Sequence, residues 1–370
     1  MKTCRWRWWT LMGFWAGAAW AAPMVPASRD TVICRVRASG EPRLRVVAPA
    51  NDARMRSTAA SEYVVETEAL TLQYGRKFAL KDLSLRVPRG RIHAIVGANG
   101  AGKSSLFRVL LGFQTPSSGS ARILDQSCAQ LSPEVRGRIG FVNDEHTMPE
   151  WMRIGDVVAM QRRQYPQWDQ ARFDETAGHF NVLPEQKVAQ LSRGERAGIN
   201  LAMALAQSPE LLILDEPTLG LDVVAKRAFL EALMFCNSVD ACTIIYCSHQ
   251  MEEIERVADN LIILERGELK HMSAPDEFCE RVSLWVADLP AAAVTALRAR
   301  PEVLLLQKLD GLVHVLILDR DAQYGEVLTG FGASHVQTMP VSLDRAVNAF
   351  LTRDHAAPAE EGAGHVRTQW

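Results

Sequence analysis

The chain carries, at residues 97–104, the sequence Gly97-Ala98-Asn99-Gly100-Ala101-Gly102-Lys103-Ser104. This stretch matches GxxxxGK[ST], the pattern of a loop whose backbone N–H groups surround a phosphate. The apolar run Ile92 to Val96 precedes it and the helix-like run Ser105 to Leu111 follows it, which is the context that the pattern requires. The sequence therefore predicts an α/β fold of the P-loop type and a nucleotide site.

The residue types in this loop fit phosphate chemistry. The glycines permit backbone conformations in which successive N–H groups turn inward around an anion. A helix that begins at Lys103 directs its positive end toward the same anion. Lys103 is expected to reach the β- and γ-phosphates as a point charge, and the Ser104 hydroxyl to ligate Mg²⁺. We therefore expect ATP and Mg²⁺ here; a glycine-rich turn that matches by chance is the alternative, and both flanking runs argue against it.

A second motif consists of two acids after an apolar run. The residues Leu211-Leu212-Ile213-Leu214-Asp215-Glu216 have the form of a buried parallel strand with carboxylates at its carboxyl end. Asp215 is expected to hold Mg²⁺ through a water, and Glu216 to orient and deprotonate the attacking water. An exposed acid pair is the alternative, disfavoured because the apolar run leads directly into the pair and Pro217 ends the element.

Composition limits the classes of protein to consider. The chain has 370 residues, which suggests two domains or one large domain with additions. A formal net charge of −2 gives no sign of a basic surface, so we predict no nucleic-acid partner. The seven cysteines form no CxxC pair and no Cys/His cluster with metal spacing, which predicts free thiols in a reducing compartment.

Residues 1–61 form an N-terminal extension whose first 22 residues look like a secretory signal. Basic residues precede the apolar run Trp8 to Ala22, and Ala19-Trp20-Ala21 has the small-x-small form of a cleavage site. Three interpretations stay open: an over-extended gene start with Met55 as the initiator, an uncleaved membrane anchor, and a genuine signal. We favour the first, because an exported ATPase would have no ATP and the run is shorter than the ~20 residues of a spanning helix. The rest of the extension is predicted to be disordered.

Between the two motifs lies Leu191-Ser192-Arg193-Gly194-Glu195. The order of phosphate loop, LSxGE and LLILDEP resembles the ABC ATPases, whose signature is LSGGQ or a close relative. Gly220-Leu221-Asp222 is similar to the D-loop of that family, and Ser248-His249, after a strand from Thr243 to Cys247, is similar to its H-loop. The resemblance covers about residues 62–281, which we take as the ATP-binding domain.

The resemblance implies the fold and the partners of this domain. The fold is an ABC ATPase core with an antiparallel β subdomain and a helical subdomain. Ser192 and Gly194 would contact the γ-phosphate of ATP held by the opposite subunit, so that two ATP molecules are sandwiched in a head-to-tail homodimer. His249 would hydrogen-bond the γ-phosphate and help to fix Glu216 and the water.

Tyr74, upstream of the phosphate loop, is our candidate for the ring beneath the adenine, with simple packing as the alternative. The predicted catalytic residues are Glu216, His249 and Lys103. The predicted metal ligands are Ser104, Asp215 and Asp144. The predicted nucleotide-binding residues are Tyr74, Gly97, Ala98, Asn99, Gly100, Ala101, Gly102, Lys103, Ser104, Ser105, Ser192, Gly194 and Asp222.

Asp144 marks a departure from the family. A strand from Ile139 to Val142 is followed by Asn143-Asp144-Glu145-His146, which puts Asp144 where the family has the Q-loop glutamine. A carboxylate there would bind Mg²⁺ more strongly than an amide does, and would also bring negative charge toward the γ-phosphate. We expect slower hydrolysis or an altered metal preference.

The spacing of apolar residues becomes that of a helix from Trp151 to Gln190, with an interruption at residues 165–169. This segment resembles the helical subdomain of bacterial ABC exporter ATPases that serve two-component permeases. In that family a cleft beside it receives a short helix of the membrane subunit. Trp151 and Met152 are candidates for lining such a cleft, with core packing as the alternative.

Residues 282–353 are predicted to form a small α+β accessory module. Their pattern suggests the order β-α-β-β-α-β of a ferredoxin-like unit, closed by a last helix from Ser342 to near Arg353. No motif supports ligand sensing, so we expect packing or dimer contacts. Residues 354–370 are predicted to be a disordered tail.

Together these features predict the ATPase subunit of an ABC transporter of the exporter type. It would dimerise around two ATP and move a separate transmembrane permease, through which it is held at the cytoplasmic face of the inner (plasma) membrane. Two alternatives belong to other classes: a soluble ABC-type switch that acts on DNA or ribosomes, and a regulator that binds ATP but hydrolyses it poorly. The absence of a tandem phosphate loop, a heptad insertion and a basic stripe argues against the first.

Overall fold

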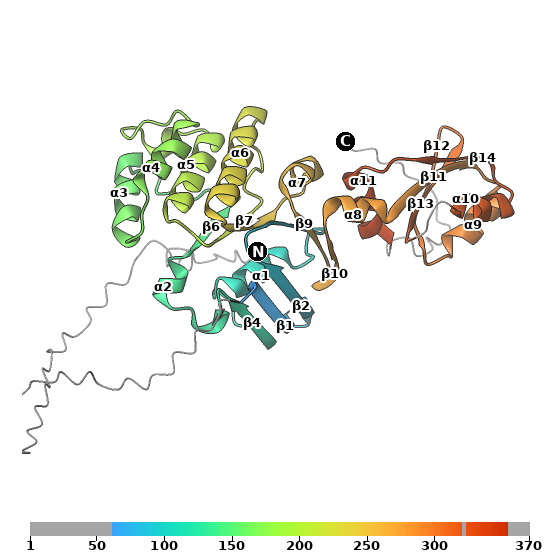
Figure 1. Ribbon diagram of the computed structural model, residues 1–370, viewed down its shortest axis with the longest axis horizontal. Helices are drawn as coiled ribbons and strands as arrows, with labels where there is room; N and C mark the ends of the chain where they lie inside the picture. The colour runs from blue at the N-terminus through green and yellow to red at the C-terminus, as the bar shows by residue number, and fades with distance from the viewer. Residues whose placement is uncertain (1–60, 320–322, 354–370) are drawn as a thin grey trace, which may run out of the picture. The chain divides into compact units, whose positions relative to one another are not determined.

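The computed structural model describes residues 61–319 and 323–353. The disorder and the signal-like segment predicted for residues 1–60, and the tail predicted for residues 354–370, lie outside this range. The described residues belong to one compact unit that contains three β-sheets (Figure 1).

The central sheet has the strand order β10-β9-β3-β8-β7-β6. Strands β9, β3, β8, β7 and β6 are parallel to their neighbours, and β10 pairs antiparallel with β9. Every residue of β3 and β8 is buried, because both faces of the sheet are covered. The bounds are β3 Ile92–Val96, β6 Ile139–Asn143, β7 Leu211–Asp215, β8 Thr243–Cys247, β9 Asn260–Glu265 and β10 Glu268–Ser273.

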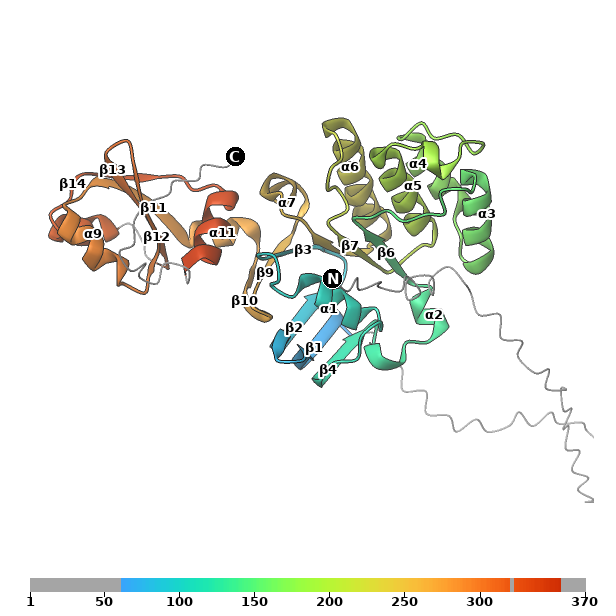
Figure 2. The same cartoon turned by 180° about the vertical axis from the view of Figure 1, so that it is seen from behind.

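One face of this sheet is covered by helix α1 (Lys103–Leu110) and an antiparallel sheet of order β2-β1-β4-β5. Figure 2 shows this sheet, α1 and α2 together on the side opposite to α3, α4, α5 and α6. Strands β1 and β2 form a hairpin that turns at Gly75 and pairs from Tyr63↔Pro88 to Tyr74↔Lys77. The remaining bounds here are β1 Tyr63–Tyr74, β2 Lys77–Pro88, β4 Ser118–Ile123, β5 Gln126–Ser127 and α2 Pro133–Arg136.

Helices cover the other face. Helix α3 ends at Gln164 and Asp169 caps α4 through the Arg172 amide, so the interruption predicted at residues 165–169 is confirmed. Gly198 of α5 lets Phe180 lie against that helix, since a Cβ at this glycine would be 2.1 Å from the Phe180 ring. The bounds are α3 Ile154–Gln164, α4 Gln170–Gly178, α5 Arg193–Ala206, α6 Val223–Asp240 and α7 Met251–Val257.

The C-terminal module has the predicted ferredoxin-like order. Its antiparallel sheet runs β12-β13-β11-β14, with helices α9 and α10 packed on one face. Helix α8 Pro275–Glu280 precedes the module, whose elements are β11 Val282–Asp288, α9 Ala291–Arg298, β12 Val303–Leu309, β13 Leu312–Leu318, α10 Tyr324–Gly330, β14 Ser334–Met339 and α11 Leu343–Thr352.

The other face of this sheet joins the core of the ATPase part. Leu284 and Leu316 of the module belong to the same buried cluster as Ile254 of α7 and Phe350 of α11. The first turn of helix α11 is also hydrogen-bonded to α7, because the Leu343 amide donates to the Glu255 carboxylate at 2.9 Å. The module is therefore attached by a continuous apolar core.

Two further observations concern the described residues. Cys128, Cys236, Cys242, Cys247 and Cys279 are free thiols, as predicted. Within the described ranges, no helix has both the length and the apolar character needed to cross a membrane.

Candidate active site

The sheet topology brings the predicted motifs to one edge. Strands β3, β8, β7 and β6 are consecutive parallel neighbours, so their carboxyl ends lie side by side. The phosphate loop follows β3, His249 follows β8, Glu216 follows β7 and Asp144 follows β6. Ligands of open α/β sheets bind outside the carboxyl ends of the strands.

The phosphate loop can be built only with glycine at two of its positions. At Gly97 a Cβ would lie 2.3 Å from the carbonyl oxygen of Leu264. At Gly102 φ is +106° and a Cβ would lie 2.5 Å from the carbonyl oxygen of Ala79. Lys103 is buried, and its Nζ donates a hydrogen bond of 2.6 Å to the carbonyl oxygen of Gly97. The ammonium group is therefore held over the loop that would surround a phosphate.

Asp215 and Ser104 place side-chain oxygen atoms beside the loop. Burial together with the charge of Asp144 raises the pKa of Asp215, and the nearby Ser104 hydroxyl opposes this rise only in part. A cation would offset both effects. Mg²⁺ uses few protein oxygens and takes the rest from phosphate and water, so this donor set fits it. No group of three or more His, Cys, Asp or Glu in the described part of the chain forms a metal site by itself.

Glu216 and His249 are in direct contact. The Nε2 of His249 lies 3.0 Å from Oε1 of Glu216, and the His249 amide donates to the other carboxylate oxygen at 3.3 Å. Glu216 has a left-handed φ of +51°, and its amide donates to the carbonyl oxygen of Cys247 on the neighbouring strand. Burial raises the pKa of Glu216 despite the nearby His249 and Lys103. A raised pKa brings a carboxylate closer to the range of an effective general base.

Asp144 lies in a loop that contacts both neighbouring motifs. Its carbonyl oxygen accepts a hydrogen bond of 3.3 Å from Arg193, whose guanidinium would be 2.7 Å from a Cβ at Gly220. A cavity of about 360 Å³ is lined here by Asp144, Glu145, His146, Leu191, Arg193 and Arg196.

His146, in the same loop, is buried, and its Nε2–H donates to the carbonyl oxygen of Pro217 at 3.0 Å. Burial lowers the pKa of His146 to about 4, so the ring is neutral at pH 7. Sequence analysis did not single out Arg193 or His146. Arg193 occupies the variable position of LSxGE, and nothing in the sequence distinguishes the contact between His146 and Pro217.

Ser192 and Asp222 are exposed and occupy helix ends. Ser192 accepts a hydrogen bond from the Glu195 amide at the start of α5, and Asp222 accepts one from the Ala225 amide at the start of α6. Gly194 lies against α6, where a Cβ on it would be 3.0 Å from the Cβ of Ala225. Among the described residues, no hydrogen bond joins Ser192, Gly194 or Asp222 to the phosphate loop.

Two other predicted positions face solvent. Tyr74 is 45% exposed, so its ring is free to stack on a ligand. Trp151 is 78% exposed and therefore lies outside the core, which disfavours the packing alternative for this side chain.

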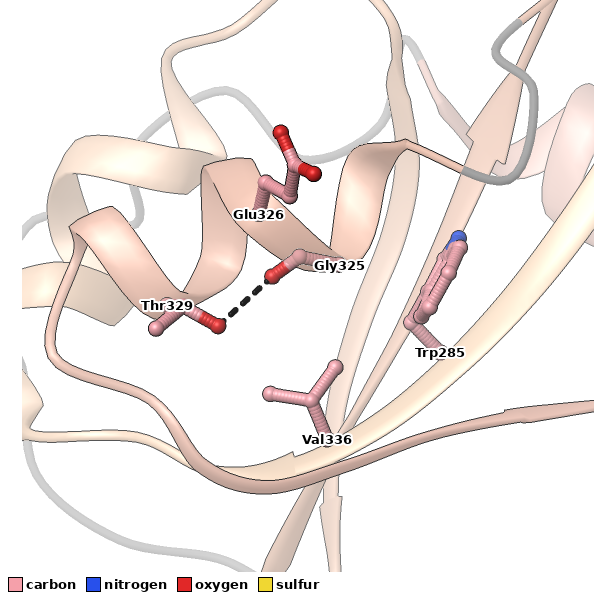
Figure 3. A pocket seen from close by; sticks show the side chains of 5 residues that line it. All are labelled: Trp285, Gly325, Glu326, Thr329 and Val336. Carbon is pink, nitrogen blue, oxygen red and sulfur yellow. Dashed lines mark hydrogen bonds between the residues drawn. The ribbon is translucent and has the colours of Figure 1, made fainter.

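A second cavity, of about 430 Å³, lies in the C-terminal module and contains none of the predicted site residues. Figure 3 shows Trp285 of β11 and Val336 of β14 opposite helix α10, where Thr329 hydrogen-bonds the Gly325 carbonyl oxygen. The absence of a side chain on Gly325 lets the Trp285 ring approach, since a Cβ there would be 3.0 Å from it.

Comparison with known proteins agrees with this site. A protein family described as ABC transporter matches residues 80–219, from β2 to the loop after Glu216. The putrescine transport ATP-binding protein PotG of Escherichia coli K12 is 32% identical over 269 residues, which cover 70% of this chain and 71% of PotG. The methionine import ATP-binding protein MetN 1 of Acinetobacter baylyi is 33% identical, over 52% of this chain and 56% of that protein.

A relative named for export and a solved structure are also similar. The Nod factor export ATP-binding protein I of Cupriavidus pinatubonensis is 33% identical over 55% of this chain and 64% of that protein. A bacterial ABC transporter cassette solved as a dimer superposes with a TM-score of 0.52 at 23% identity, over 57% of this chain and 98% of the cassette, which supports the fold.

The fold and the site define a P-loop ATPase of the ABC type, with a helical and an antiparallel β subdomain around one central sheet. The chain belongs to the ATP-binding subunits of ABC transporters, which bind and hydrolyse ATP. The names of its relatives include transport proteins for both import and export, so the predicted direction does not follow from the family alone.

Proposed function

We propose that two copies of this chain close head to tail around two ATP molecules with Mg²⁺ and thereby move a separate membrane permease, in the direction of export. The observation that carries the dimer is that Ser192 and Asp222 sit at exposed helix ends with no bond to the phosphate loop of their own chain. Beside them, the side chains of Val223 and Val224 are 82% and 80% exposed. Two adjacent apolar side chains this exposed form a patch that a protein partner could cover. A similar cassette was solved as a dimer, which supports association of two copies.

The roles proposed for the residues follow the geometry. Lys103 and the phosphate-loop amides, Ser105 included, bind the phosphates, and Tyr74 stacks on the adenine. Ser104 and Asp215 hold Mg²⁺, which supplies charge neutralisation at the phosphates. Glu216, oriented by His249, accepts the proton of the attacking water.

Export and attachment to the membrane are supported by the helical segment α3–α4 and the relative named for Nod factor export. The exposed Trp151 precedes α3 and is a candidate contact for a permease helix. The chain would then lie at the cytoplasmic face of the inner membrane and be held there by the permease.

The dimer is tested with Glu216→Gln, a variant in which ATP should persist uncleaved. With ATP and Mg²⁺ the molar mass measured by light scattering should double, and with ADP it should remain that of one chain. Adding Ser192→Arg should abolish the doubling, because the arginine would project into the γ-phosphate site of the partner. A monomer at every protein concentration tried would contradict the proposed dimer.

Asp144 is proposed to contribute to the Mg²⁺ site, since its charge already acts on Asp215. Asp144→Gln should raise the Mg²⁺ concentration needed for half-maximal hydrolysis by about 10-fold, as loss of an outer metal contact typically does. Glu145→Gln, one residue away, is the matched control for loss of a charge in this loop. If Asp144→Gln left turnover, Mg²⁺ dependence and coupling to the permease unchanged, the metal role would be wrong.

A further inference from the structure

The carboxylate of Glu253 lies at the centre of a buried polar cluster behind the active site. Glu253 belongs to α7 and is only 6% exposed. Its Oε2 accepts hydrogen bonds from the hydroxyls of Thr218 at 2.8 Å, of Ser248 at 3.1 Å and of Tyr246. The other oxygen has no hydrogen bond within the described residues and faces the Lys226 ammonium at 3.7 Å.

The three hydroxyls come from the segments that carry the reacting groups. Thr218 follows Glu216 by two residues, and its carbonyl oxygen accepts the Leu221 amide in the turn that leads to Asp222. Ser248 directly precedes His249, and its oxygen also accepts the Gln250 amide at 3.1 Å. Tyr246 lies in β8, two residues before Ser248 and opposite Leu214 of β7. One carboxylate oxygen therefore connects the loop after β7 with the loop after β8.

The chemistry of a carboxylate suits it to this position. An ionised carboxylate accepts hydrogen bonds and donates none, so all three hydroxyl protons must point toward it. Hydrogen bonds to a charged acceptor are about twice as strong as neutral ones. The orientation of Thr218, Tyr246 and Ser248 is thus set by one charge, and the lone pairs of Ser248 are left for the Gln250 amide.

Stability alone does not explain a charge at this place. A buried ion pair costs desolvation that its attraction often fails to repay, and apolar residues of similar volume usually serve a core as well. Lys226 is moreover too distant for a hydrogen bond to Glu253. What the carboxylate provides and an apolar side chain could not is a fixed separation between two polar loops.

We propose that Glu253 is a positioning residue for ATP hydrolysis: through Thr218 and Ser248 it holds the loops that carry Glu216 and His249 in contact. The inference rests on the function proposed above for Glu216 and His249, whose side chains are 3.0 Å apart in this arrangement. Glu253 touches neither the nucleotide site nor Lys103 among the described contacts, so ground-state binding of ATP does not depend on it.

The test is Glu253→Gln in the full chain, which keeps the size of the side chain and removes its charge. The kcat for ATP hydrolysis should fall by about 10- to 100-fold, the loss expected from a small misplacement of reacting groups. KM and the affinity for a fluorescent trinitrophenyl-ATP should change less than about twofold. The reason is that the variant keeps the contacts that bind ATP equally in the ground state and in the transition state. Glu252→Gln, on the exposed face of the same helix, should leave all three values unchanged.

A double variant separates positioning from general damage. In a Glu216→Gln background, Glu253→Gln should cause no further loss, because residues that act as a unit are not additive. Tyr246→Phe and Ser248→Ala each remove one hydroxyl, and each should lower kcat by a smaller factor with KM unchanged. These two variants decide the question if Glu253→Gln fails to fold.

The results that would overturn the proposal are distinct from those that would overturn the proposed function. A wild-type kcat in Glu253→Gln would exclude positioning by Glu253. So would a fall in kcat that is as large in the Glu216→Gln background as in the wild-type background. Loss of nucleotide affinity together with kcat in Tyr246→Phe and Ser248→Ala would indicate a merely structural cluster. A wild-type kcat in Glu216→Gln alone would instead contradict the role proposed for Glu216.

Discussion

Replacing Glu216 by glutamine is expected to lower the rate of ATP hydrolysis by about 10²- to 10⁴-fold, the contribution of a well-placed general base. Glutamine keeps the size of the side chain and its carbonyl oxygen, and it cannot accept a proton at the pH of the reaction. His249 would still find a hydrogen-bond partner at the position that lies 3.0 Å from its Nε2. Affinity for ATP should persist, because the phosphate contacts of Lys103 and the loop amides are unaffected.

The pH dependence of the rate provides a second readout for Glu216. Since burial raises the pKa of this carboxyl above its ordinary value of 4.5, the unprotonated base should be lost as the pH falls through that raised value. The wild-type rate should therefore decline on the acid side at a higher pH than an ordinary carboxyl would give. The residual rate of Glu216→Gln should lack this decline. Phosphate release measured between pH 5 and pH 8 decides the matter, and an unchanged rate in the variant would remove Glu216 from the role.

Replacing Lys103 by alanine is expected to weaken ATP binding by about 10²- to 10⁴-fold. Lys103 would form charge-assisted bonds to two phosphates, each worth about 1.5–3 kcal/mol, and about 1.4 kcal/mol corresponds to a factor of ten. Among the described residues, the hydrogen bonds of the ammonium go to the carbonyl oxygens of Gly97 and Ala98, at 2.6 and 3.4 Å, so its loss should not unfold the sheet.

Titration with a fluorescent ATP analogue measures the effect of Lys103→Ala. Lys81→Ala is the matched control, because Lys81 is exposed and bonded to Glu268 at 2.7 Å on the neighbouring hairpin. The control should bind the analogue as the wild type does. Affinity in Lys103→Ala within threefold of the wild type would place the phosphates elsewhere.

Much of the fold could be predicted because local patterns specify the elements. The strand predicted from Thr243 to Cys247 has those bounds, and the order of elements in residues 282–353 is the one predicted. Both segments have apolar periodicity with turn residues at their ends, so short-range information suffices. Helix α1 begins at Lys103, as the phosphate-loop pattern predicts.

The contacts across the site could be predicted only where a known pattern connects them. The pairing of Glu216 with His249 followed from the family resemblance, since 33 residues separate them. The bond of His146 to Pro217 and the cluster around Glu253 join residues far apart in sequence, and no spacing rule applies to such contacts. The roles of Ser192 and Asp222 do not follow from contacts within one chain, because a single chain does not contain the site in which we propose that they act.

The apolar cluster that runs from α7 into β11 and α11 has a consequence for how this ATPase can be divided. The boundary that we propose near residue 281 separates two topologies, and Ile254 and Phe350 on either side of it share one interior. Separating the chain near residue 281 would expose apolar surface to water on both fragments. The accessory module therefore forms part of the hydrophobic core of the ATPase, and we expect the ATPase part to need it for stability.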